Sequence, residues 1–141
     1  MFARPSAALA LAFLLGASLP GRASEEPRAF VCKFTSGVAH VYESGKFSSE
    51  QASPLTFGIG AIDSRGQTAD LLTERGTGHL RVVQAVNAMH FLEVVTEGFL
   101  HITTVYDKDD NGAYPAVHSR HFGMLGQPIV TQYQGFCQAK G

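Results

Sequence analysis

The sequence predicts an all-β domain, a small antiparallel up-and-down barrel of about eight strands, with a two-layer β-sandwich as the alternative. Downstream of residue 28, short runs rich in Val, Ile, Thr, Phe and Tyr alternate with glycine-bearing turns, which is the signal of strands. The connections between these runs are short, and short loops force neighbouring strands to pair antiparallel. The two cysteines lie near the two ends of this region. A disulfide between them would bring the ends of the meander together and favours closure, which removes edge strands.

Eight strands are expected in chain order, over residues 30–42, 55–62, 68–73, 79–86, 90–96, 99–106, 116–122 and 129–137. On the first, Phe30, Cys32 and Phe34 share a face, and Gly37 marks a probable β-bulge. On the second, the odd-numbered residues from Leu55 to Ala61 share a face. The intervening turns carry residues that tolerate positive φ or preset φ, as in 64–66 and 109–112. The polar stretch 43–54 is expected to be a loop or a lid.

Residues 1–23 differ in kind from the remainder and predict a secretory signal peptide. A start carrying Arg4 leads into an uncharged apolar run over residues 7–17, Pro20 then breaks the helix, and Gly21 and Ala23 supply small residues for cleavage. The apolar run is short for a permanent span of ~30 Å of hydrocarbon. We therefore expect one domain, residues 24–141, in the periplasm or outside the cell, with no membrane anchor after cleavage.

Cys32 and Cys137 are expected to form a disulfide, because an even cysteine count in an exported chain indicates pairing in an oxidising compartment. The bridge would close a loop of more than a hundred residues, for which the chain-entropy model gives ~4–5 kcal/mol of stabilisation as an upper figure. It also requires the two Cα atoms to lie within ~7 Å. Free thiols or a metal pair are the competing interpretations, and neither has CxxC spacing in its favour.

The run 107–112 matches the first half of a calcium-binding loop, with Asp107, Asp109 and Asn111 as candidate oxygen ligands. The second half does not match, because His118 stands where a bidentate glutamate is needed. A hairpin turn with Asn-Gly at its tip explains the same residues, and it is the preferred interpretation. Calcium binding is kept as an alternative, and no other cofactor is expected.

No catalytic residue is assigned, and the chain is expected not to be an enzyme. A nucleophile elbow and metal-binding His spacings are missing from the sequence. His118 and His121 are three residues apart on one strand and must face opposite ways, and all six histidines are expected at the surface or rim. Glu93 and Glu97 share a strand face and could act as acid and base in a cleft, but both are expected on the solvent-exposed face of the sheet.

The apolar, glycine-bearing segment 122–128 offers candidate rim contacts in Phe122, Met124 and Leu125, although core filling is the alternative. The chain has 11 basic and 12 acidic residues, so no basic field exists to bind nucleic acid. The leading hypothesis is therefore a non-catalytic binding module for a small apolar ligand or a protein partner.

An exported inhibitor or stabiliser of another protein, and a calcium-stabilised module, are the alternatives. A small barrel clamped by a terminal disulfide is similar in architecture to the periplasmic lysozyme inhibitors. Tyr42 follows Ser36 and Gly37 at too great a distance for their short inhibitory loop. No residue roles are carried over from that resemblance.

Overall fold

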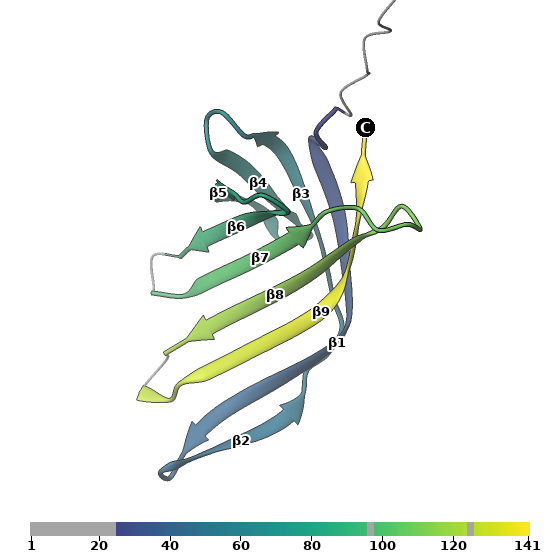
Figure 1. The fold of residues 1–141 in the computed structure, drawn as a ribbon. Coiled ribbons are helices and arrows are strands. Elements are labelled where there is room, and N and C mark those ends of the chain that lie inside the picture. Colours follow the sequence, from purple (N-terminus) through teal and green to yellow (C-terminus); the bar gives the residue numbers. More distant parts are fainter. Residues whose placement is uncertain (1–24, 96–97, 124–125) are drawn as a thin grey trace, which may run out of the picture.

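The computed structural model describes residues 25–95, 98–123 and 126–141, so the predicted signal peptide lies outside the described residues. Over these residues the chain forms nine strands, which join in one continuous antiparallel sheet (Figure 1). The strands are β1 (Ala29–Glu43), β2 (Lys46–Gln51), β3 (Leu55–Asp63), β4 (Thr68–Thr73), β5 (Gly76–Gln84), β6 (Ala88–Val94), β7 (Leu100–Tyr106), β8 (Tyr114–Phe122) and β9 (Ile129–Lys140). Within those residues, no helix has the length and apolarity needed to cross a bilayer.

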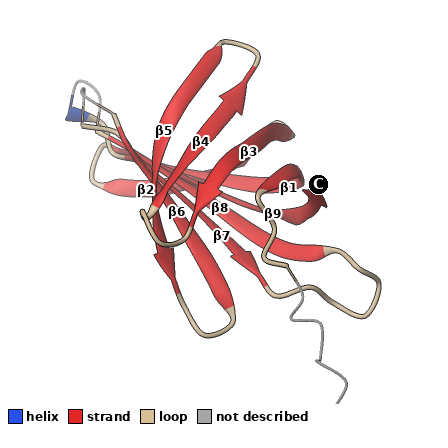
Figure 2. Cartoon of the chain, turned by 90° about the horizontal axis from the view of Figure 1, so that it is seen from above, coloured by secondary structure: helices blue, strands red, loops and turns tan. Residues whose placement is uncertain are grey.

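Eight of the strands close into a barrel. From β3 to β9 each strand pairs antiparallel with the next, and the first half of β1 pairs with β3. The other edge of β1 pairs with β9 along nearly its whole length, from Ala29 opposite Lys140 to Val41 opposite Ile129. The view from above shows β1 and β9 side by side on one wall (Figure 2). The predicted barrel is therefore confirmed, and the sandwich alternative is excluded.

The ninth strand, β2, corrects the expectation of a loop over residues 43–54. It pairs with the second half of β1, from Val38 opposite Gln51 to Glu43 opposite Lys46. The connecting residues Ser44 and Gly45 both have positive φ, at 52° and 82°, as a two-residue type I′ hairpin requires. Every residue of β2 is exposed, so the strand has no buried face and shows none of the apolar alternation that identifies strands in a sequence.

The predicted inward face of the first strand is confirmed, since Phe30, Cys32 and Phe34 are all almost fully buried. Strand β3, the second strand expected from the sequence, departs from strict alternation, because its register with β4 shifts between Gly60 and Asp63. Ala61 lies at this irregularity with φ of 47° and is exposed rather than inward. In β1 the bulge falls between Phe34 and Ser36, directly before the Gly37 that was expected to mark it.

The disulfide between Cys32 and Cys137 is present, and it joins directly opposed residues of β1 and β9. Their Cα atoms are 4.0 Å apart, and both side chains are fully buried inside the barrel. This bond fixes the register of the seam at which the barrel closes. It is compatible with an oxidising, exported environment.

Candidate functional site

A group of polar side chains points into one end of the barrel. The strand register places Glu93 of β6 opposite His101 of β7, and His101 opposite Arg120 of β8. The next inward residue of β8, His118, pairs with Thr103 of β7 on one side and with Tyr133 of β9 on the other. Alternation turns all of these side chains inward, because they keep the parity of the buried Phe91, Val105 and Ala116 on their own strands.

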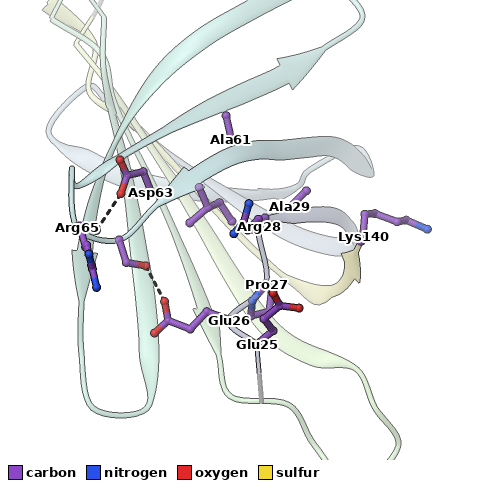
Figure 3. Close-up of a pocket in the computed structure, with 12 residues that line it drawn as sticks. Glu25, Glu26, Pro27, Arg28, Ala29, Ala61, Asp63, Arg65 and Lys140 are labelled. Carbon is purple, nitrogen blue, oxygen red and sulfur yellow. Dashed lines mark hydrogen bonds between the residues drawn. The ribbon is translucent and has the colours of Figure 1, made fainter. Parts of the chain in front are cut away.

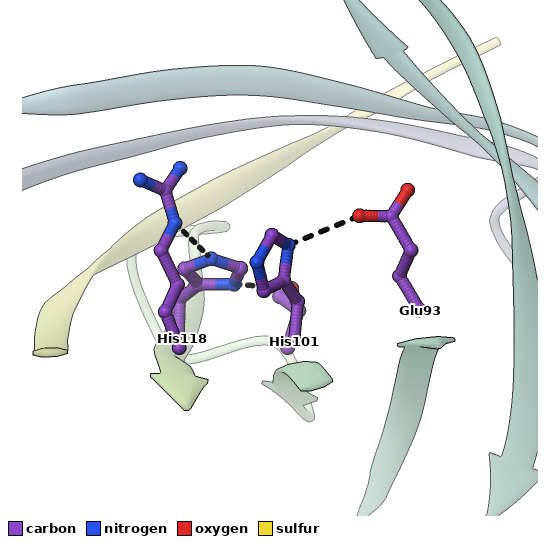
Figure 4. A network of polar contacts seen from close by, with 5 residues as sticks. Glu93, His101 and His118 are labelled. Atoms are coloured by element: carbon purple, nitrogen blue, oxygen red, sulfur yellow. Dashed lines mark hydrogen bonds and ion pairs between the residues drawn. The ribbon is translucent and has the colours of Figure 1, made fainter. Parts of the chain in front are cut away.

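These side chains form two hydrogen-bonded groups, one around His101 and one around His118, and the two imidazole rings pack with their centres 6.0 Å apart (Figure 4). Glu93 Oε1 lies 3.0 Å from His101 Nδ1. His118 Nδ1 lies 2.7 Å from Thr103 Oγ1, and Arg120 Nε donates to His118 Nε2 at 3.3 Å. The guanidinium carbon of Arg120 also lies 5.7 Å from the centre of the Tyr133 ring, within the range of a cation–π contact.

The contacts of His118 fix its tautomer. An arginine N–H can only donate, so Nε2 of His118 must be the acceptor and carries no proton. The ring proton is therefore on Nδ1, which donates to the Thr103 hydroxyl. The ring is 4% exposed and is packed among the rings of Phe34, Phe57 and Tyr133, with centres 5.8, 5.0 and 6.0 Å away.

This environment holds His118 in its neutral form. Burial, reinforced by the positive charge of Arg120 and by repulsion from His101 whenever that ring is also protonated, lowers the pKa of His118 from 6.5 to about 3. A proton on Nε2 would also face the Arg120 N–H that now binds there. His118 is thus a structural acceptor that orients Arg120.

The low pKa of His118 predicts that the fold loses stability in mild acid. Between pH 6.5 and 3 the unfolded chain binds a proton at His118 that the folded chain does not, so the free energy of unfolding should fall as pH falls, by ~1.4 kcal/mol per pH unit from this residue. Urea unfolding at pH 7 and pH 5 should differ by about 2 kcal/mol more in the wild type than in His118→Asn, which cannot titrate. Equal pH dependence in the two proteins would show that His118 has an ordinary pKa.

His101 offers the one buried side-chain polar atom without a hydrogen-bond partner in the described part of the chain, its Nε2. Burial lowers the pKa of His101; Glu93 raises it, and Arg120 and His121 lower it further. The contact with Glu93 is accordingly a hydrogen bond from a neutral imidazole to a carboxylate. With the proton on Nδ1, the lone pair of Nε2 is left free to accept a hydrogen bond.

A cavity of about 380 Å³ opens beside these polar side chains. It lies where β3 and β7 begin and where β4 and β8 end, and it is lined by Leu55, Thr56, Phe57, Leu71, Thr73, Glu74, Arg75, His101, His118 and Arg120. This volume is within the range of small-molecule sites, and such sites combine apolar walls with a few convergent polar groups. The deeper interior is filled by aromatic rings, so the cavity occupies the mouth of the barrel rather than its centre.

A larger groove of about 810 Å³ lies where the first described residues pass the β3–β4 turn (Figure 3). Three of its polar side chains, those of Glu26, Asp63 and Ser64, have hydrogen-bond partners within the chain. Ser64 donates to Glu26, and Asp63 Oδ1 accepts from the backbone N–H groups of Arg65 and Gly66. The mouth cavity is the better candidate site, because inward-pointing polar side chains converge there and one of them, His101, has a buried acceptor without a partner among the described residues.

The candidate calcium segment forms a turn between β7 and β8. Asp109 Oδ1 accepts hydrogen bonds from the backbone N–H groups of Asn111 and Ala113, and the Asp109 carbonyl accepts one from Gly112 N–H. Within the described residues, no group of three or more His, Cys, Asp or Glu side chains is placed to hold a metal ion. The turn explains the acidic run locally, and calcium binding through Asp107, Asp109 and Asn111 remains an untested prediction.

Of the predicted rim residues, Phe122 lies beside the candidate site, whereas Met124 and Leu125 fall outside the described residues. The Phe122 ring is half-buried, with its centre 5.0 Å from that of Phe99 and 5.7 Å from that of His101. It therefore forms part of the wall behind His101.

The placement expected for two polar residue types was wrong. Glu93 is not on the wet side of the sheet, because its side chain is 16% exposed and points into the barrel mouth. His118 is buried rather than at the rim, although the prediction that it and His121 face opposite ways is confirmed. Glu97 falls outside the described residues. Arg120 was not singled out from the sequence, since only the strand register shows that it shares a face with His118.

Comparison with known proteins found no match: no family model, no curated protein and no solved structure is similar to this chain. The fold alone defines the class of this protein, which is a closed antiparallel β-barrel with an internal disulfide.

Proposed function

We propose that this protein is an exported, non-catalytic binding module that holds one small molecule in the mouth of its barrel. The observation that carries the proposal is the cavity of about 380 Å³, which is lined by the inward-pointing Arg120 and by His101, whose buried Nε2 has no hydrogen-bond partner among the described residues. Burying such groups without partners costs free energy. A ligand that satisfies them would recover that cost.

The walls support a ligand with an apolar body. Leu55, Phe57 and Leu71 line one side of the cavity. Phe57 stacks on the buried ring of Phe34 in the core, which limits how far a long chain could enter. The ligand is therefore compact, and it contacts both the apolar wall and the polar side chains.

The test uses two neighbouring leucines of β4 that face opposite ways. Leu71 lines the cavity, whereas Leu72 is 44% exposed on the outside. Leu71→Trp should fill the cavity, and Leu72→Trp should add the same bulk to the outer surface. We expect native mass spectrometry of protein purified from its own source to show a retained small molecule on the wild type and on Leu72→Trp, with at least about tenfold lower occupancy on Leu71→Trp.

Equal occupancy in both variants would place the ligand elsewhere and contradict the proposal. A wild-type chain that carries only a partner protein, or a calcium mass that a chelator removes, would favour the inhibitor or calcium-stabilised alternative instead. Conversion of the recovered molecule on incubation with fresh protein would overturn the non-catalytic assignment.

A further inference from the structure

We infer that the barrel mouth selects a small monocarboxylic acid with an apolar body and a hydroxyl or amine donor, held through Arg120 and His101. This inference rests on the proposed function and names the ligand's chemical class. Two unpartnered groups on residues that line the cavity carry it, and the charges around them limit the choice further.

The first contact is the positive charge of Arg120. Its Nε is occupied by His118, and within the described ranges no carboxylate lies within 4.0 Å of its guanidinium nitrogens. The side chain is half-buried and lines the cavity, with the Tyr133 ring against it. Because Nε is engaged, the two Nη groups are the ones left to bind a ligand. Two adjacent N–H donors match the two oxygens of a carboxylate.

The second contact is the lone pair of His101 Nε2. The hydrogen bond from Nδ1 to Glu93 keeps the ring oriented and assigns the proton to Nδ1. Nε2 is buried and accepts from no other described residue. A ligand O–H or N–H that displaces the side chains covering this atom would supply the missing donor, which a purely apolar acid lacks.

The charges around the cavity favour a single negative charge on the ligand. Arg75 at the β4–β5 turn adds a second cation, but Glu74 beside it lines the same cavity. Glu93 stands behind His101. Two carboxylates so close to the mouth would repel a dianion such as a phosphate monoester, whereas Arg120 can neutralise one carboxylate.

The test compares three probes of one shape: para-hydroxyphenylacetate, its uncharged carboxamide, and phenylacetate, which lacks the hydroxyl. Titrations followed by NMR should show the acid binding at least about tenfold tighter than the carboxamide. Arg120→Met should abolish that preference, and Arg120→Lys should restore part of it. Arg81→Met, which removes an exposed arginine on the same barrel, should leave the preference intact.

The hydroxyl contact is tested through Gly78, without altering His101. A Cβ on Gly78 would meet the Glu93 carboxylate, so Gly78→Ala should push Glu93 away from His101. The His101 proton would then no longer be held on Nδ1 and could move to Nε2. We expect this variant to lose the advantage of para-hydroxyphenylacetate over phenylacetate and to keep the preference for acid over carboxamide.

Equal binding of acid and carboxamide by the wild type, or no binding of the acid at millimolar concentration, would overturn this inference. A preference for the acid that survives Arg120→Met would overturn the role given to Arg120. None of these results bears on the occupancy difference between Leu71→Trp and Leu72→Trp. The proposed function is therefore tested independently of this inference.

Discussion

Replacing Cys32 and Cys137 together by alanine is expected to lower the free energy of unfolding by about 4 kcal/mol. The bond links residues 105 positions apart, and without it the unfolded chain regains the entropy of a loop that spans almost the whole domain. The folded state also loses two fully buried sulfur atoms from its core.

Urea unfolding of the double variant against the oxidised wild type measures this loss. The wild type reduced in denaturant serves as the control, because it keeps both cysteine side chains and differs only in the bond. A loss below about 1 kcal/mol in both would show that the pairing of β1 with β9 closes the barrel without covalent help.

Gly135→Ala is expected to destabilise the barrel by roughly 3 kcal/mol, at the upper end of the range for overpacking. A Cβ at this position would collide with the Lys33 carbonyl oxygen and with Phe34 Cα, 2.8 Å away. Both obstacles are backbone atoms of β1, so no side-chain rotation can relieve the collision. The strain falls on the seam between β1 and β9, next to the bulge between Phe34 and Ser36.

Gly123→Ala is the matched control, since no atom of the residues that the structure describes lies within 4 Å of its added Cβ and its φ is not positive. We expect thermal unfolding to shift by several degrees for Gly135→Ala and negligibly for Gly123→Ala. Similar Tm values for the two variants would mean that β1 and β9 are further apart at Gly135 than the structure shows.

The fold was predictable because its determinants are local. Alternation around Phe30 and Phe34 identifies a strand, glycine-bearing turns space the strands evenly, and the spacing of Cys32 and Cys137 brings the ends together. The exception, β2, has no buried face. Its one sequence signal was the Ser44–Gly45 turn between residues capable of pairing.

The candidate site was not predictable to the same extent, because it depends on register. Strand parity correctly separated His118 from His121, but it does not say which face of a strand points inward when polar residues occur on both. His101 meets Glu93 and Arg120 only through the pairing of three strands. A one-residue slip would have turned His101 outward.

Ligand binding at the barrel mouth depends on a neutral His101 whose Nε2 lone pair has no partner within the described residues. Nitrogen-detected NMR of the histidine rings at neutral pH measures the protonation of each ring nitrogen. We expect His101 and His118 both to be uncharged with the proton on Nδ1, and we expect addition of para-hydroxyphenylacetate to change the Nε2 signal of His101. A doubly protonated His101, or a proton on its Nε2, would contradict this expectation.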